Sequence, residues 1–171
     1  MQELFRYPLI GAILYRLQMI RVDTCGGGKE RENLARFAKR AYDSGRFITI
    51  YPEGHLMAIG EHERYRSGIY YMAHDFNLPV TPIATCVGLL WNRRDWKKNP
   101  GRAAIEFLPP IPPGLEKAEF MRRLEDSIEE ATARLVAEFS GQPFKRAAYV
   151  SRSEGERPKD SAPLAQGLHK P

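Results

Sequence analysis

Long apolar runs and cysteines are both scarce in this chain of 171 residues. The longest clean apolar stretch, residues 8–15, is far shorter than the roughly 20 residues that span a bilayer. With a mean hydropathy of −0.46, the composition favours a globular chain over an integral membrane protein. Cys25 and Cys86 are not expected to form a disulfide, because an isolated bridge is unusual in a chain without a visible secretion signal. We therefore expect a reduced, cytoplasmic setting.

Histidines are also few, and their spacing matches no common metal site. The four are His55, His62, His74 and His169, and none belongs to an H-E-x-x-H pattern. We expect no metal and no bound cofactor.

The positive charge has one concentrated source. The formal net charge is +5, and residues 91–98 contain four basic side chains and two tryptophans. Such a block can lie at an anionic bilayer surface, where basic and aromatic side chains both bind. The alternative is a solvated basic loop. Nucleic acid is not an expected partner, because the block is short and no nucleic-acid-binding motif accompanies it.

Strand patterns alternate with helix patterns along the chain. Apolar runs predict strands at residues 20–22, 46–51, 80–86 and 102–108, and helical periodicity predicts helices at residues 4–17, 30–44, 67–75 and 116–139. This alternation favours an α/β fold with a largely parallel central sheet flanked by helices. We expect one domain over residues 1–140. Residues 141–171 have few apolar anchors and are expected to form a disordered tail.

The segment from Tyr51 to Gly68 contains the strongest functional signal. Pro52 cannot donate to a strand ladder, and Gly54 permits a turn that other residues resist. Glu53 is thereby placed at the carboxyl end of a predicted strand, where open α/β sheets bind ligands. A basic cluster around Arg64 and Arg66 follows. An acid with cations nearby suits a polar, phosphorylated substrate.

The same segment resembles the third sequence block of the glycerolipid acyltransferases, above all the bacterial 1-acyl-sn-glycerol-3-phosphate acyltransferases. That block reads F-P-E-G-T-R, a spacer with a glycine, and F-K-x-G; here the matching residues are Tyr51-Pro52-Glu53-Gly54, Gly60 and Tyr65-Arg66-Ser67-Gly68. Residues 78–84 resemble the following block, and residues 19–24 resemble the preceding one. The resemblance spans roughly residues 3 to 138.

The resemblance implies an enzyme of phospholipid biosynthesis. It would move a fatty acyl group from acyl-CoA or acyl-carrier protein to the free hydroxyl of 1-acyl-sn-glycerol 3-phosphate, giving phosphatidic acid. It would work as a peripheral protein at the cytoplasmic face of the inner membrane. The residues expected to bind the lysophospholipid substrate are Glu53, Gly54, His55, Arg64, Arg66 and Gly68. His55 is alternatively a loop histidine without a role, and Glu53 could merely brace the turn by accepting backbone hydrogen bonds.

Two departures from the family pattern affect this expectation. The H-x-x-x-x-D motif, whose His is the general base in the family, is absent, so the catalytic residue is unknown. We expect a truncated chain; a catalytically inactive lipid-binding remnant is the alternative. The family's phosphate-binding arginines are replaced by Leu56 and Thr24. Because neither can donate the paired hydrogen bonds of Arg, a different lysolipid acceptor is a further alternative.

Overall fold

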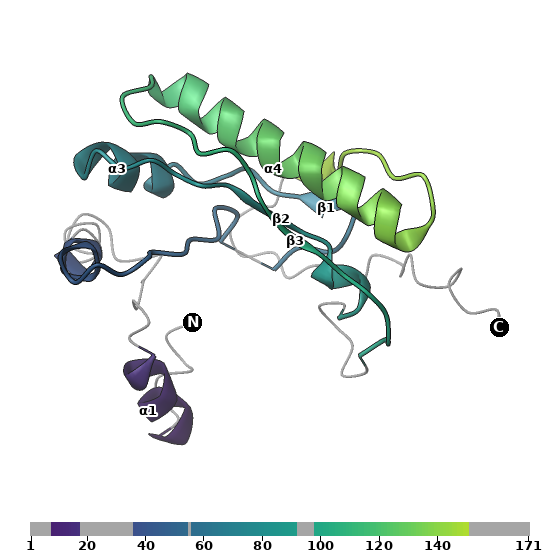
Figure 1. The fold of residues 1–171 in the computed structure, drawn as a ribbon, viewed down its shortest axis with the longest axis horizontal. Coiled ribbons are helices and arrows are strands. Elements are labelled where there is room, and N and C mark those ends of the chain that lie inside the picture. Colours follow the sequence, from purple (N-terminus) through teal and green to yellow (C-terminus); the bar gives the residue numbers. More distant parts are fainter. Residues whose placement is uncertain (1–7, 18–35, 55, 92–97, 151–171) are drawn as a thin grey trace. The chain divides into compact units, whose positions relative to one another are not determined.

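The computed structural model describes residues 8–17, 36–54, 56–91 and 98–150. The chain divides into two compact units, Met1–Ile50 and Tyr51–Pro171, which are considered separately (Figure 1). None of the described helices is long and apolar enough to cross a membrane.

The first unit contains two described helical segments. Helix α1 (Pro8–Arg16) begins at a proline, which suits the first helical position because its missing N–H would have no helical partner there. Residues 36–43 are helical, and the turn that follows contains Gly45, which has a φ of +68°. The predicted helices at 4–17 and 30–44 are confirmed over these parts. The predicted strand at 20–22 and Thr24 lie outside the described residues.

The predicted strand at residues 46–51 is wrong. These residues adopt no regular secondary structure, and the side chain of Phe47 is fully exposed. A strand needs a neighbour for its N–H and C=O groups, and none of the described segments pairs with this one. The apolar run was a reason to predict a strand, but it contains no information on whether another strand pairs with it.

The second unit has a mixed α/β composition. Its elements are β1 (Glu61–His62), α3 (Gly68–Asp75), β2 (Ile83–Thr85), the 3-10 turn η2 (Val87–Leu89), β3 (Ile105–Phe107), α4 (Lys117–Ser140) and β4 (Ala148–Tyr149). The predicted helices at 67–75 and 116–139 are confirmed within about one residue at each end. Strands β2 and β3 fall within the predicted ranges but are shorter.

The described strands form two small sheets. β2 pairs antiparallel with β3, and β1 pairs parallel with β4. The α/β class is therefore confirmed, while a largely parallel central sheet is not shown among the described residues. Strand β4 lies within the range predicted as a tail, and residues 151–171 lie outside the described residues, so the domain boundary at residue 140 stays a prediction.

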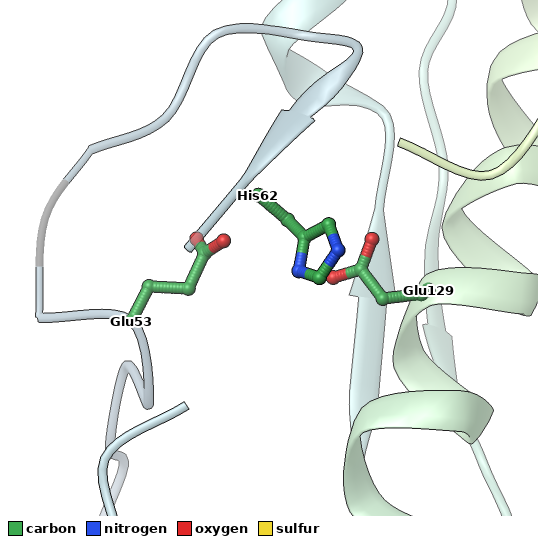
Figure 2. Close-up of side chains that lie close together, drawn as sticks. All are labelled: Glu53, His62 and Glu129. Carbon is green, nitrogen blue, oxygen red and sulfur yellow. The ribbon is translucent and has the colours of Figure 1, made fainter. Parts of the chain in front are cut away.

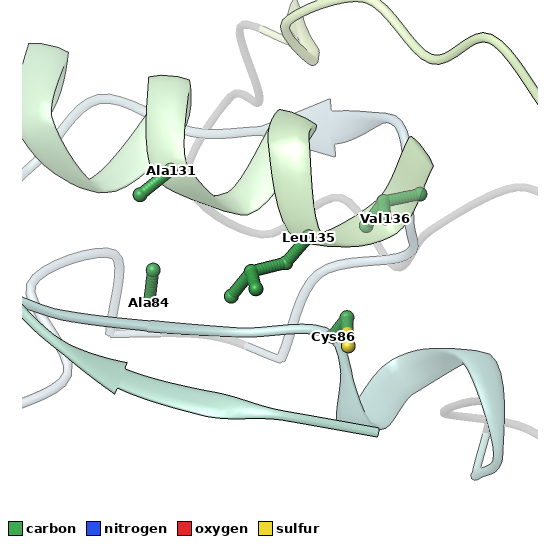
Figure 3. Close-up of a cluster of buried hydrophobic side chains, with 5 residues drawn as sticks. All are labelled: Ala84, Cys86, Ala131, Leu135 and Val136. Carbon is green, nitrogen blue, oxygen red and sulfur yellow. The ribbon is translucent and has the colours of Figure 1, made fainter. Parts of the chain in front are cut away.

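Helix α4 forms the core by covering one face of β2 (Figures 1 and 3). Ala84 and Cys86 of the β2 segment pack against Ala131, Leu135 and Val136 of α4. Cys86 is a buried free thiol within this cluster. The helix ends at Gly141, whose φ of +68° is left-handed and whose N–H bonds to the carbonyl of Ala137. The other face of the β2–β3 pair exposes Ile83, Ile105 and Phe107.

Candidate functional site

The loop at Pro52–Gly54 makes a tight turn beside Arg66. Gly54 has a φ of +71°, and its N–H bonds to the carbonyl of Tyr51 at 3.0 Å. The N–H of Arg66 bonds to the carbonyl of Pro52 at 2.8 Å. A Cβ on residue 54 would lie 3.0 Å from Nε of Arg66. The structure therefore brings together two predicted site residues that are 12 positions apart in sequence.

Glu53 braces this turn. Its Oε1 accepts a hydrogen bond of 3.1 Å from the N–H of Glu63, immediately after β1. The carboxylate thus performs the bracing role that the sequence left open, and it does so beside the segment that contains Arg66. The side chain of Glu53 is half-buried.

The other predicted site residues contribute less to this geometry. Arg64 is exposed, and Gly68 begins α3 in open space, since a Cβ at its position would have no neighbour within 4 Å. His55 lies outside the described residues. Leu56, at the position of a family arginine, is 66% exposed and offers no hydrogen bond to a substrate.

The sequence did not predict a group of buried polar side chains near this loop, of which Figure 2 shows His62 and Glu129. The Tyr65 hydroxyl donates a 2.7 Å hydrogen bond to Oε1 of Glu129 on α4. Burial, reinforced by the neighbouring Glu129 carboxylate, raises the pKa of Tyr65 well above its ordinary value. His62 is 5% exposed, and the centres of its ring and the Tyr149 ring lie 5.6 Å apart in an edge-to-face arrangement. The phenol therefore stays protonated and holds the loop segment to α4.

One sequence signal for Glu129 was present but weak. Glu129 stands seven residues before Val136, so the two lie nearly on the same side of the helix. Both are buried, so the face of α4 that packs in the core includes a carboxylate as well as apolar side chains. His62 lies on a strand of only two residues and Tyr65 lies after its end, so neither residue gave a comparable signal.

The described histidines do not include an obvious base for the transfer reaction. His62 is buried, and His74 lies at the exposed end of α3 with Nδ1 3.5 Å from the Asp75 carboxylate. The arrangement can instead offer Arg66, an exposed guanidinium held at a tight glycine turn, to an anionic group. This part of the molecule can therefore bind an anionic group.

Comparison with known proteins identifies relatives with one activity. The family model described as Acyltransferase matches residues 1–86. A protein of Pseudomonas aeruginosa named 1-acyl-sn-glycerol-3-phosphate acyltransferase is 27% identical over 139 residues, covering 81% of this chain and 54% of that protein. Proteins of the same name from Limnanthes alba and Cocos nucifera are 23% and 22% identical over 111 residues, covering 64% of this chain and 40% and 36% of their own lengths. The chain thus spans about half the length of the first of these curated relatives and less of the others. No solved structure matches it significantly.

Proposed function

The chain belongs to the acyltransferase family, and on this premise we propose that it takes part in acylating 1-acyl-sn-glycerol 3-phosphate. A fatty acyl group would pass from acyl-CoA or acyl-carrier protein to the free hydroxyl, giving phosphatidic acid. The carrier is a co-substrate in this proposal, and the transfer uses no bound cofactor. The names of the curated relatives support the acceptor and the reaction.

The placement of Arg66 against Gly54 carries the proposal. The backbone of the loop is held by the Pro52–Arg66 hydrogen bond and by the Glu53 carboxylate, so the Arg66 side chain extends from a fixed backbone position before substrate arrives. A guanidinium donates two parallel hydrogen bonds to a phosphate, which a lysine cannot reproduce. The role we assign to Arg66 is therefore to bind the acceptor's phosphate.

The chemical step needs a proton acceptor besides these residues. In our proposal the loop supplies acceptor recognition, and the general base is a residue outside the set of Glu53, Gly54 and Arg66. We also propose that the α/β fold contains the largely parallel sheet expected from the sequence.

A peripheral position at the cytoplasmic face of the inner membrane is part of the same proposal. Lys98 Nζ lies 4.4 Å from the centre of the Trp91 ring, and this tryptophan is 55% exposed. Exposed Ile105 and Phe107 add apolar surface on the β2–β3 face. Basic, aromatic and apolar side chains of this kind favour an anionic bilayer surface.

Two alternatives rest on specific residues. Exposed Leu56 stands where the family has a phosphate-binding arginine, which favours a lysolipid acceptor with a different head group. A catalytically inactive lipid-binding remnant would use the same loop without a base, and the burial of His62 favours this alternative.

The test measures binding and turnover with the same protein. Calorimetric titration of a short-chain lysophosphatidate, below its micelle concentration, is compared with the matching monoacylglycerol that lacks the phosphate. We expect Arg66→Ala to weaken lysophosphatidate binding by roughly 10-fold or more, because charge-assisted hydrogen bonds are lost. Arg66→Lys should bind with intermediate affinity. Arg122→Ala, which removes an exposed arginine of α4, is the matched control and should bind like the wild type.

Turnover distinguishes the alternatives. Release of CoA with lysophosphatidate, and a KM for lysophosphatidate raised by Arg66→Ala, would support the proposal. Binding without turnover would favour the remnant, and turnover only with another lysolipid would favour the changed acceptor. Equal affinity of the wild type and Arg66→Ala would remove Arg66 from the site.

A further inference from the structure

Three side chains from separate segments meet around a buried imidazole (Figure 2). His62 lies on β1, Glu53 on the loop before it, and Glu129 near the middle of α4. One donor atom from each, a ring nitrogen or a carboxylate oxygen, lies within 4.8 Å of the other two. The sequence predicted no metal because these residues share no local spacing pattern; the fold assembles them.

The imidazole in this cluster has an unsatisfied nitrogen. His62 is 5% exposed, and among the described residues its Nδ1 has no hydrogen-bond partner. Buried polar atoms nearly always have a partner, so such an atom calls for a physical explanation. Figure 2 shows the ring between the two carboxylates, with one nitrogen on the side of each. Because the two nitrogens point to different sides of the ring, a single ion would bind one of them together with one oxygen of each carboxylate.

The two carboxylates give this cluster a negative charge. Glu129 is 6% exposed and accepts a hydrogen bond from Tyr65, yet no Lys or Arg within the described part of the chain forms an ion pair with it. Arg146, whose charge acts on Glu129, forms its ion pairs with other carboxylates. Buried charges are normally paired or coordinate a metal. A cation at this point would satisfy both the charge and the imidazole.

We propose that Glu53, His62 and Glu129 bind Zn²⁺. An imidazole with two carboxylates is a ligand set that suits Zn²⁺, whereas Mg²⁺ prefers oxygen ligands alone. Donor atoms that bind one Zn²⁺ at about 2.1 Å lie roughly 3.4 to 4.2 Å apart, so side-chain movements on the order of 1 Å close the site. The half-buried Glu53 gives the ion a path of entry.

The bound ion would have a structural role. It would fasten the loop that contains Gly54 to β1 and to α4, and so fix the turn against which Arg66 lies. This inference goes beyond the proposed acyl transfer and does not rest on it. Its test can therefore succeed or fail whatever the acceptor is.

The test uses the purified 171-residue chain after treatment with a chelator. Added Zn²⁺ should bind at one ion per chain and raise the Tm, and chelator should reverse the rise. Mg²⁺ should have no such effect. Glu53→Gln keeps a carbonyl oxygen for the Glu63 N–H but removes a charged ligand. It and His62→Gln should each lower Zn²⁺ affinity more than about 10-fold, since even the loss of an outer partner of a ligand costs that much.

His74→Gln is the matched control, because His74 is an exposed histidine next to Asp75 and outside the cluster. Its Zn²⁺ affinity should equal that of the wild type. Unchanged affinity in both Glu53→Gln and His62→Gln, or equal stabilisation by Mg²⁺, would overturn the proposal. Co²⁺ bound to the wild-type chain provides a measurement that needs no variant: we expect visible absorption bands of a four-coordinate site, and their absence would overturn the proposal as well.

Discussion

The hydroxyl of Tyr65 donates a hydrogen bond of 2.7 Å to Oε1 of Glu129, a residue 64 positions later in the chain. Both side chains are buried, so the bond joins the segment after β1 to the middle of α4 inside the second unit. The residue next to Tyr65 is Arg66, the proposed phosphate ligand. The buried Tyr65–Glu129 bond thereby helps to position Arg66, whose side chain is exposed.

Tyr65→Phe should lower the free energy of unfolding by about 1–3 kcal/mol, because it leaves the buried Glu129 oxygen without its donor. Urea unfolding measures the change. Tyr51→Phe is the control, since Tyr51 is 80% exposed and its loss of a hydroxyl should have little effect. Equal effects of the two substitutions would show that the Tyr65–Glu129 bond adds nothing to stability.

Gly54→Ala and Gly141→Ala should destabilise the chain to a similar extent but differ in their effect on lysophosphatidate binding. Both glycines have left-handed φ values, +71° and +68°, so an alanine at either should destabilise the chain by roughly 1–2 kcal/mol. Only at Gly54 would the new Cβ press on Arg66, since Gly141 has nothing within 4 Å. We expect Gly54→Ala alone to weaken lysophosphatidate binding in calorimetry. Equal binding by the two variants would contradict the assigned contact.

Leu135→Ala should destabilise the second unit by about 2–5 kcal/mol, because Leu135 is 4% exposed and fills the space between α4 and β2. Guanidinium unfolding monitored by circular dichroism measures the loss. Leu56→Ala, which truncates a side chain that is 66% exposed, should be close to neutral. A small effect at Leu135 would mean that the helix and strand close the cavity by moving together.

The first turn of α4 should weaken in acid. Hydrogen bonds from Arg123 and then Arg122 hold the pKa of the Glu119 carboxyl below its ordinary value of 4.5. Because the folded pKa is lowered, this contribution to stability is present above pH 4.5 and is lost as pH falls through the lowered pKa. Thermal unfolding should therefore separate the wild type from Glu119→Gln at neutral pH but not in strong acid. The difference should shrink at a salt concentration of about 1 M, since both arginines are exposed and Glu119 is partly exposed. A difference that persists there would contradict the electrostatic cause.

Local sequence patterns predicted the long elements well. Helix α4 was predicted from its helical periodicity, because periodicity is a local property of the sequence. Helix α3 followed from the same reasoning. The pairing of Gly54 with Arg66 was anticipated through the family resemblance, which placed both in one site.

The errors and omissions concern contacts between distant residues. The apolar run from Phe47 to Ile50 predicted a buried strand, yet a strand depends on a partner that the run does not contain. Likewise, nothing near Glu129 in the sequence reveals that His62 and Tyr65 will meet it. The partners of a buried carboxylate on a helix can be identified only after the helix has been placed against its neighbours.

The order of synthesis affects when the contacts of helix α4 can form, because Tyr65 and Tyr71 are both synthesised before this helix. Tyr71 accepts a hydrogen bond from Lys117, 46 residues later, and Tyr65 can donate its own only once Glu129 has been made. At a synthesis rate of roughly 5–20 residues per second, the 64 positions from Tyr65 to Glu129 take about 3 to 13 s to be made. Throughout that interval the loop with Glu53 and Gly54 exists without the helix that fixes it. The bond that joins the first-made part of the second unit to α4 can therefore form only after residues 66–129 have been made.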